Sequence, residues 1–176
     1  MRRLALAACL LAAPAFGADD GFAFIPPGGR SLLEGLLTAD PEGVAALAAA
    51  RPAADWQAAL AAGTAGLAGS EALDDWQRQT LADYLAYAGA IADAAALPWD
   101  GRDMALAKCQ SCHIITVTVT QARPPEQWLG TFSKPSHVGV PLDPAERAQL
   151  ADYLAVNAGI PIDEIPPELR AGGATY

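Results

Sequence analysis

One six-residue segment, Leu-Ala-Asp-Tyr-Leu-Ala, occurs twice in this chain and restricts the folds open to it. The copies lie in two longer stretches, Arg78–Ile91 and Arg147–Ile160, which are offset by 69 residues and identical at eight of fourteen positions. In the second stretch, Leu150, Tyr153 and Leu154 fall on one face of a helix. The chain is also rich in alanine and leucine, with interspersed acids and glutamines, which favours helix. We therefore predict an all-α fold that contains two related helices.

A tryptophan precedes each copy, at Trp56 and Trp128, which favours duplication of a whole helical unit. The alternative is that alanine-rich helices look alike through composition alone. Proline and glycine residues at 97–101 would separate two units. We expect a first helical domain over residues 18–96 and a second domain, with a C-terminal extension, over residues 97–176.

The sequence marks the start of the last helix clearly. Asp143 suits the cap, Pro144 the first helical position, and Glu146 is the acidic residue three positions after the cap. We expect this helix to run to Ala158 and to end at Gly159.

The first 17 residues have the features of a cleaved signal peptide. Met1–Arg3 is positively charged, Leu4–Ala15 is apolar but too short to span a bilayer, and small residues precede Asp19–Asp20. The alternatives are a buried alanine-rich helix and a lipoprotein signal that ends at Cys9, before which the apolar stretch is short. We predict secretion into the periplasm.

The charge of the chain is acidic and unevenly distributed. Loss of Arg2 and Arg3 with the signal would change the net charge from −9 to −11. Residues 18–100 contain 3 basic and 12 acidic side chains, whereas residues 101–176 contain 6 and 8. This balance argues against binding to nucleic acid or to an anionic membrane. No second apolar run is long enough to span a bilayer.

Two of the three cysteines and one of the two histidines lie in a single pentapeptide, Cys109-Gln110-Ser111-Cys112-His113. A thioredoxin-like pair would need a βαβ context, and a zinc site would need more ligands at short spacing than His137 alone supplies. A plain disulfide is a further alternative in an oxidising compartment. The pattern favours covalent attachment of one haem c, with both thiols bound to the haem vinyl groups and the adjacent histidine on the iron.

Residues 100–160 resemble a class I c-type cytochrome. The likeness rests on Gly101 before an amphipathic first helix, then the Cys-x-x-Cys-His motif, a loop, and a last helix with Tyr-Leu. It implies that the first and last helices cross, so that Gly101 meets Tyr153, and that Met104 is a core residue. The first domain has neither Cys nor His and would be a copy of this fold without haem. Its space would be filled by leucine and alanine from residues 44–73.

The same resemblance directs attention to the sixth iron ligand. In this family it is usually a methionine about sixteen residues before the tyrosine of the last helix. Met1 would leave with the signal and Met104 lies in the first helix, whereas His137 stands sixteen residues before Tyr153 in a loop bounded by prolines. We therefore expect bis-His ligation by His113 and His137, and a lower redox potential than a methionine ligand gives.

The stretch Gln121–Trp128 resembles part of the haem domains of quinohaemoprotein amine dehydrogenases. That likeness implies that Arg123 and the indole N–H of Trp128 hold the haem propionates, and both groups suit carboxylates. The alternative is a surface arginine and a core tryptophan. Ile115–Thr120 alternates like a strand, and we expect a short strand or loop there.

The sequence thus predicts a periplasmic monohaem cytochrome c that transfers single electrons between redox partner proteins. It shows no acid–base or nucleophile pattern, so we expect an electron carrier without independent catalysis. Its acidic first domain suggests partners with a basic docking face. The alternatives are a docking or haem-bearing subunit of a larger dehydrogenase, and a haem sensor or enzyme with an open sixth site.

Overall fold

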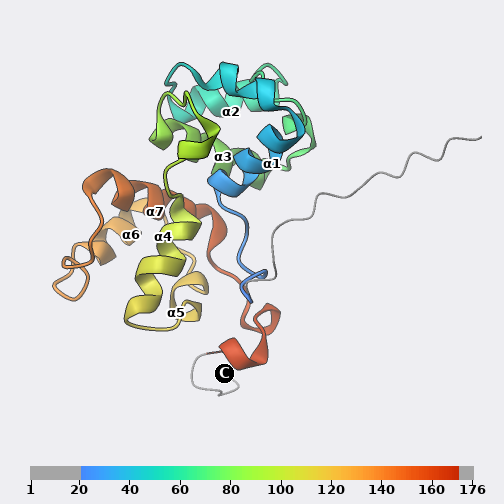
Figure 1. Ribbon diagram of the computed structural model, residues 1–176. Coiled ribbons are helices and arrows are strands. Elements are labelled where there is room, and N and C mark those ends of the chain that lie inside the picture. The colour runs from blue at the N-terminus through green and yellow to red at the C-terminus, as the bar shows by residue number, and fades with distance from the viewer. Residues whose placement is uncertain (1–20, 171–176) are drawn as a thin grey trace, which may run out of the picture.

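The computed structural model describes residues 21–170, and the expected signal peptide lies outside them. The described chain is all-α, as predicted, and contains no strand. Its α-helices are α1 (Gly29–Ala39), α2 (Ala53–Ala61), α3 (Asp75–Ala88), α4 (Gly101–Lys108), α5 (Thr116–Val119), α6 (Pro125–Phe132) and α7 (Pro144–Asn157), shown in Figure 1. Short 3-10 turns join them at Pro41–Leu47, Ser70–Ala72, Ala94–Ala96, Cys109–Ser111, Ile162–Glu164 and Pro167–Leu169.

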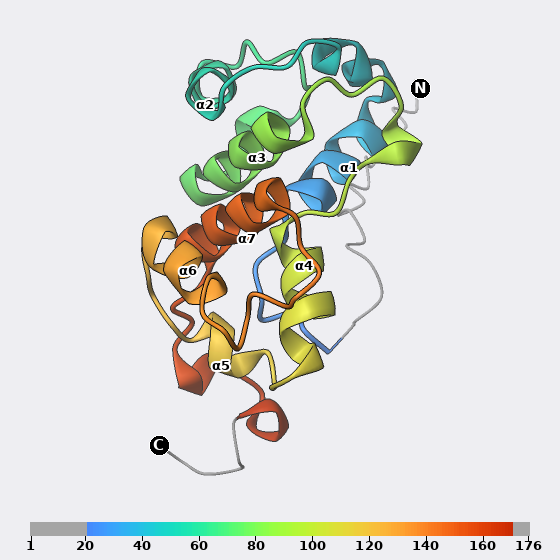
Figure 2. The same cartoon turned by 90° about the vertical axis from the view of Figure 1, so that its left-hand side faces the viewer.

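The helices form two halves with separate apolar cores. The first half contains α1 to α3 and is closed around Trp56, Leu47 and Leu81, among others. The second half contains α4 to α7 and is closed around Met104 and Trp128 with the apolar face of α7. Helices α3 and α7 lie side by side where the halves meet (Figures 1 and 2). The contact between α3 of the first half and α7 of the second half therefore forms the boundary between them.

The two halves repeat one packing motif. A Cβ added to Gly29 on α1 would lie 2.2 Å from the Cβ of Tyr84 on α3, and one added to Gly101 on α4 would lie 2.1 Å from the Cβ of Tyr153 on α7. Such distances are far shorter than van der Waals contact, so only glycine allows each pair of helices to approach so closely. The predicted contact between Gly101 and Tyr153 is confirmed.

The same tyrosines also link the halves to each other. The Tyr84 hydroxyl donates to the carbonyl of Pro98 at 3.0 Å, just before α4, and the Tyr153 hydroxyl donates to the carbonyl of Pro26 at 2.6 Å, just before α1. The neighbouring Ile25 is buried in the core of the second half. A fragment beginning at residue 97 would lose these contacts, so the second half is not independent of the N-terminal segment.

Asp100 joins the helix starts of both halves. Its carboxylate accepts from the backbone N–H of Asp103 at 2.9 Å and thereby caps α4. It also accepts from the N–H of Arg30 at 2.8 Å, in the first turn of α1. The residue before α1 is Gly28, which has no side chain to cap that helix. One carboxylate therefore supplies two helix caps.

The local sequence predicted the start of the last helix, α7, correctly, but it did not predict the helical turn α5. The predicted cap of α7 is confirmed, because Asp143 accepts from the N–H of Glu146 and Glu146 reaches back to the N–H of Asp143. The strand considered over Ile115–Thr120 is wrong, since this stretch contains the helical turn α5. A lone strand would leave its backbone groups without a partner strand, whereas the turn satisfies them locally.

We expect Asp152→Asn to stabilise the protein at neutral pH. Asp152 on α7 and Asp83 on α3 face the boundary between the halves, and burial raises the pKa of both carboxyl groups; Asp83 raises that of Asp152 further. A raised folded-state pKa gives stability at low pH that is lost as pH rises through it. The amide should therefore raise the free energy of unfolding at pH 7 by about 0.5–1 kcal/mol, a range reduced by solvent screening.

The measurement for Asp152→Asn is urea unfolding of both proteins between pH 3 and pH 8. The gain should shrink to nothing at acidic pH, where the wild-type carboxyl groups are protonated. A gain that is the same at every pH would show that the charge pair is not its cause.

No helix within residues 21–170 combines the length and apolar character needed to cross a membrane.

Candidate functional site

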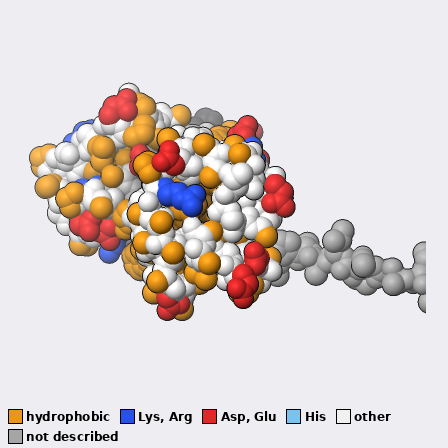
Figure 3. Space-filling model, turned by 90° about the horizontal axis from the view of Figure 1, so that it is seen from above, with side chains coloured by type: hydrophobic (Ala, Val, Ile, Leu, Met, Phe, Trp, Pro, Cys, Tyr) orange, Lys and Arg blue, Asp and Glu red, His pale blue; other side chains and the backbone are white. Residues whose placement is uncertain are grey.

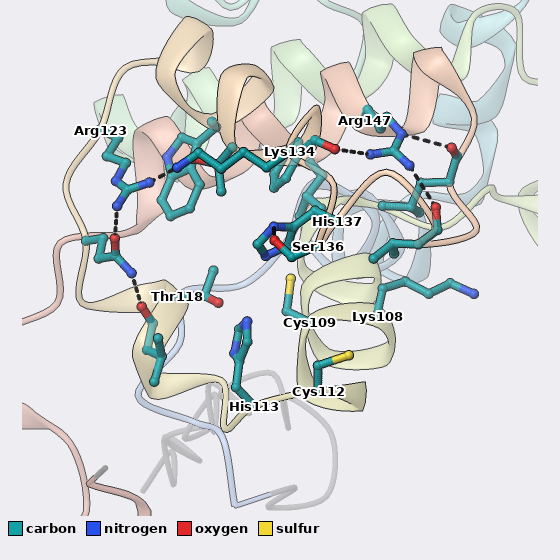
Figure 4. A pocket seen from close by; sticks show the side chains of 18 residues that line it. Lys108, Cys109, Cys112, His113, Thr118, Arg123, Lys134, Ser136, His137 and Arg147 are labelled. Carbon is teal, nitrogen blue, oxygen red and sulfur yellow. Dashed lines mark hydrogen bonds between the residues drawn. The ribbon is translucent and has the colours of Figure 1, made fainter.

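A cavity of about 400 Å³ opens in the second half, between the end of α4, α5, α6 and the loop before α7 (Figure 4). This volume lies in the range of about 300–1,000 Å³ typical of small-molecule and cofactor sites. The structure brings all six predicted site residues to its wall: Cys109, Cys112, His113, Arg123, Trp128 and His137.

The two thiols come from the end of α4. Cys109 caps that helix and begins a 3-10 turn, which brings Cys112 to the same side of the cavity (Figure 4). Both thiols are free. Burial raises the pKa of Cys109 to about 11, an effect partly offset by a hydrogen bond with Thr118. The Cys109 thiol therefore keeps its proton at neutral pH.

The two histidines face the cavity from different segments, His113 after the 3-10 turn and His137 in the loop between α6 and α7 (Figure 4). The Nδ1 of His113 lies 3.3 Å from the carbonyl oxygen of Ile114, which can only accept, so Nδ1 carries the proton. The Nδ1 of His137 pairs with the Ser136 hydroxyl at 2.9 Å. Each ring thus uses Nδ1 for a neighbouring oxygen and leaves Nε2 for a ligand.

The geometry does not favour a bare metal ion. Within the described residues, no group of three or more His, Cys, Asp and Glu side chains is arranged to hold one. Zinc sites need three or four such ligands around a single point. The cysteines and histidines share a cavity wall, an arrangement that suits a larger group placed between them.

The charged residues that line the cavity are all basic, although the ammonium group of Lys108 lies over the Trp99 ring, outside the cavity lining. Lys108, Arg123, Lys134 and Arg147 line it, and none of the lining residues in the described part of the chain is acidic. This contrasts with the net charge of −9 for the whole chain. The lining therefore favours a ligand with negative groups. Sequence reasoning did not assign Lys108, Lys134 or Arg147 to the site, and it noted Arg147 only as a residue of the repeat.

Arg123 and Trp128 are neighbours, as the sequence predicts for a shared role. The Arg123 guanidinium carbon lies 5.1 Å from the centre of the Trp128 ring, and the guanidinium donates to Thr131 and Gln121. The Trp128 side chain is 2 % exposed, and its buried indole N–H has no hydrogen-bond partner among residues 21–170. A ligand carboxylate in the cavity would satisfy such a donor.

The first half contains the same arginine–tryptophan pair. Arg51 lies 4.6 Å from the centre of the Trp56 ring, and the buried indole N–H of Trp56 also lacks a partner within the described chain. The unsatisfied indole is therefore a feature of the repeat. It does not by itself indicate a ligand, so the propionate role of Arg123 and Trp128 stays a prediction.

The halves differ in how their loops before the Tyr-Leu helix are packed. In the first half the loop between α2 and α3 buries Ala65 and Leu67, and Leu37 on α1 is buried as well. Residues 44–73 contribute Leu47, Ala65 and Leu67 to the buried core of the first half, and their filling of a space that haem would occupy stays a prediction. In the second half the corresponding loop, residues 133–143, buries no residue fully, and the cavity lies beneath it.

Met104 is 0 % exposed in the core of the second half and is not among the residues that line the cavity. Its predicted role as a core residue is confirmed. The cavity wall, as formed by the described residues, offers imidazole nitrogens and thiols and no thioether sulfur.

Comparisons of the chain with protein-family models, with curated proteins and with solved structures each found no match. The fold and site define a class only: an all-α protein with two repeated halves, one of which holds a cavity lined by thiols, imidazoles and basic side chains.

Proposed function

We propose that this protein is a monohaem c-type cytochrome that carries single electrons between redox partners in the periplasm. The observation that carries the proposal is the convergence of Cys109, Cys112, His113 and His137 on one cavity of about 400 Å³. Few other groups use two thiols and two histidines across a space of this size. The bound haem would supply a one-electron Fe(III)/Fe(II) exchange.

The residues fit covalent attachment without a change of oxidation state. Cys109 and Cys112 would each hold the haem through a thioether, formed by addition of the thiol S–H across one vinyl group, with no atom lost and no oxidant needed. Free and protonated thiols suit this addition, and both cysteines are free. In this proposal Cys109 and Cys112 would hold the haem, and Arg123 and Trp128 would bind its carboxylates.

His113 and His137 would hold the haem iron in this proposal. With Nδ1 of each ring bound to a neighbouring oxygen, Nε2 of His113 and of His137 would be the ligand atoms. Hydrogen bonds at Nδ1 fix the ring orientation and raise the basicity of Nε2. Two imidazoles favour a lower potential than an imidazole and a thioether.

Partners of this electron carrier would contact both the cavity rim and the acidic first half. Ile114, Val117 and Val138 are exposed apolar residues next to or near the two histidines in the sequence. Acidic side chains are spread over the face of the molecule seen in Figure 3, and residues 18–100 carry 12 acids against 3 bases. We propose that a basic partner is attracted to this half and that the attraction weakens with salt.

The first test of the proposed function is the mass of the denatured protein. After production with a haem-ligation system, we expect the mass of the chain plus one haem, and iron in place of zinc. Replacing both cysteines by serine should abolish the covalent haem. A denatured wild-type chain without added mass would contradict the proposal.

We expect His137→Ala to open the sixth site. The wild-type haem should be low-spin in both oxidation states and should bind carbon monoxide poorly, because two strong ligands occupy the iron. The variant should become high-spin or take up an external ligand, and should bind carbon monoxide readily. Met104→Leu is the matched control, since Met104 lies in the core, and its spectrum should equal that of the wild type.

A high-spin wild-type haem that binds carbon monoxide as readily as His137→Ala would instead support the sensor or enzyme with an open sixth site.

A further inference from the structure

Arg147, in the first turns of α7, spans the loop that carries His137. Its guanidinium donates to four backbone carbonyls at 2.8–3.1 Å: those of Phe132, Val138, Val140 and Leu142. These carbonyls begin at the end of α6 and continue to the residue before the cap of α7. A planar fork with several fixed N–H groups is suited to such a set of acceptors, whereas an ammonium group is not.

The loop has few other anchors. Ser133, Lys134, Pro135 and Ser136 are exposed, and Val138 and Gly139 are exposed as well. Its remaining backbone bonds are short-range turns within the loop, such as His137 N–H to Lys134 O at 2.8 Å and Val140 N–H to His137 O at 3.0 Å. A loop with little buried surface depends on polar anchors for its position. Arg147 connects it to a helix whose inner face is fully buried.

The repeat supplies a natural comparison. Arg78 on α3 is the counterpart of Arg147 and donates to the carbonyl of Leu73, the counterpart of Leu142. Its other partner is the exposed Asp75 on its own helix. The first-half loop is instead held by its buried apolar side chains. The two halves therefore share one arginine–carbonyl contact, and the other three occur only where a histidine stands in the loop.

We propose that Arg147 is the positioning residue for His137. By fixing the carbonyls on both sides of the histidine, it keeps His137 directed into the cavity and so sets the sixth ligand of the haem. This inference rests on the proposed function, because it assigns a role in ligation of the same haem. Arg147 itself does not touch the iron in this scheme.

The test uses Arg147→Lys and Arg147→Gln in the full chain with haem attached. Loss of charge-assisted hydrogen bonds should raise the population with His137 off the iron by about tenfold or more. The variants should show a high-spin fraction and faster binding of carbon monoxide than the wild type. Added imidazole should restore the low-spin spectrum, because it enters the opened site.

Arg78→Lys is the matched control, the same change at the equivalent position of the half without haem. It should lower the free energy of unfolding but leave the spin state and carbon monoxide binding unchanged. Spectra are compared at equal folded fraction, measured by circular dichroism.

Two results would overturn the positioning role and leave the proposed function intact. One is an Arg147→Lys protein that is destabilised like Arg78→Lys and remains fully low-spin. The other is failure of both Arg147 variants to fold, which would make Arg147 a residue of the fold. If His137→Ala has the wild-type spectrum, it is the ligand assignment of the proposed function that fails.

Discussion

Asp100→Ala is expected to lower the free energy of unfolding of the whole protein by about 2–4 kcal/mol, because two helix caps of about 1–2 kcal/mol each are lost together. The carboxylate is 1 % exposed and accepts N–H groups from the first turns of both α1 and α4. Alanine leaves both helix starts buried without an acceptor. Because one side chain serves both halves, they should lose stability together in a single unfolding transition.

Two substitutions separate the double cap from other effects. Asp74→Ala removes the cap of α3 alone, so it should cost about 1 kcal/mol. Asp100→Asn removes the charge and keeps one acceptor oxygen, whereas the carboxylate uses both of its oxygens. Burial raises the pKa of Asp100, and the nearby Asp103 raises it further, so the charged form is opposed at neutral pH. Removing the charge is therefore not costly in itself, but the amide NH2 of asparagine cannot accept the second N–H, so Asp100→Asn should lose one of the two caps and cost less than Asp100→Ala.

Urea unfolding, followed by tryptophan fluorescence and circular dichroism, measures these differences. Equal effects of Asp100→Ala and Asp74→Ala would contradict the double cap. Two separate transitions in Asp100→Ala would contradict the coupling of the halves.

Local patterns predicted those elements whose determinants are close in sequence. The cap of α7 needs only Asp143, Pro144 and Glu146, and all three act within one turn. The repeat was visible because the segment Leu-Ala-Asp-Tyr-Leu-Ala recurs around Tyr84 and Tyr153, and the structure shows that both tyrosines pack on a glycine. The prediction for the segment that forms α5 failed because its β-branched alternation favours a strand only when a partner strand exists.

The coupling of the two halves could not be predicted in this way. The contact from Tyr153 to Pro26 joins residues separated by 127 positions, and that from Arg30 to Asp100 joins residues separated by 70. In each contact one partner is a backbone group, the carbonyl of Pro26 or the N–H of Arg30, and any residue type could supply it. The sequence therefore does not mark these positions. Gly28 leaves room for the carboxylate of Asp100, a role that is evident only once both helices are in place.

The sequence predicted which thiols and imidazoles line the candidate site, but it did not predict the residue that holds the His137 loop in place. Cys109, Cys112 and His113 form a motif, and His137 was found by its distance from Tyr153. Arg147 gave no such signal, because all four of its acceptors are backbone carbonyls. Residues that position a ligand through the backbone leave no pattern of side chains to detect.

We expect Gly101→Ala and Gly29→Ala each to cost about 3 kcal/mol or more, at or beyond the upper end of typical overpacking. The new Cβ would lie 2.1 Å from the Tyr153 Cβ in the first case and 2.2 Å from the Tyr84 Cβ in the second. Neither tyrosine can swing away, because each ring is buried and its hydroxyl is bound to a carbonyl of the other half. The helices themselves must separate.

Gly35→Ala is the control for Gly29→Ala. Gly35 lies in the same helix, and a Cβ added there would meet no neighbouring atom of the described chain within 4 Å. Alanine should therefore stabilise the protein by about 0.5–1 kcal/mol through its higher helix propensity. Gly130→Ala in α6 should behave likewise, since its Cβ would also meet open space. If Gly29→Ala lowers the free energy of unfolding and Gly35→Ala raises it, the close approach of the helices at Gly29, and not the loss of a glycine as such, decides the effect.

Gly101→Ala and Gly29→Ala should differ in the amount of haem that the protein carries. Helix α4 leads directly into Cys109, so separating α4 from α7 at Gly101 shifts the thiols relative to the rest of the cavity. Helix α1 carries none of the proposed ligands, and Gly29→Ala should alter only stability. At equal folded fraction, Gly101→Ala should therefore carry less covalent haem than Gly29→Ala, measured by denatured mass. Equal haem content in the two variants would mean that the thiols move independently of the crossing of α4 and α7.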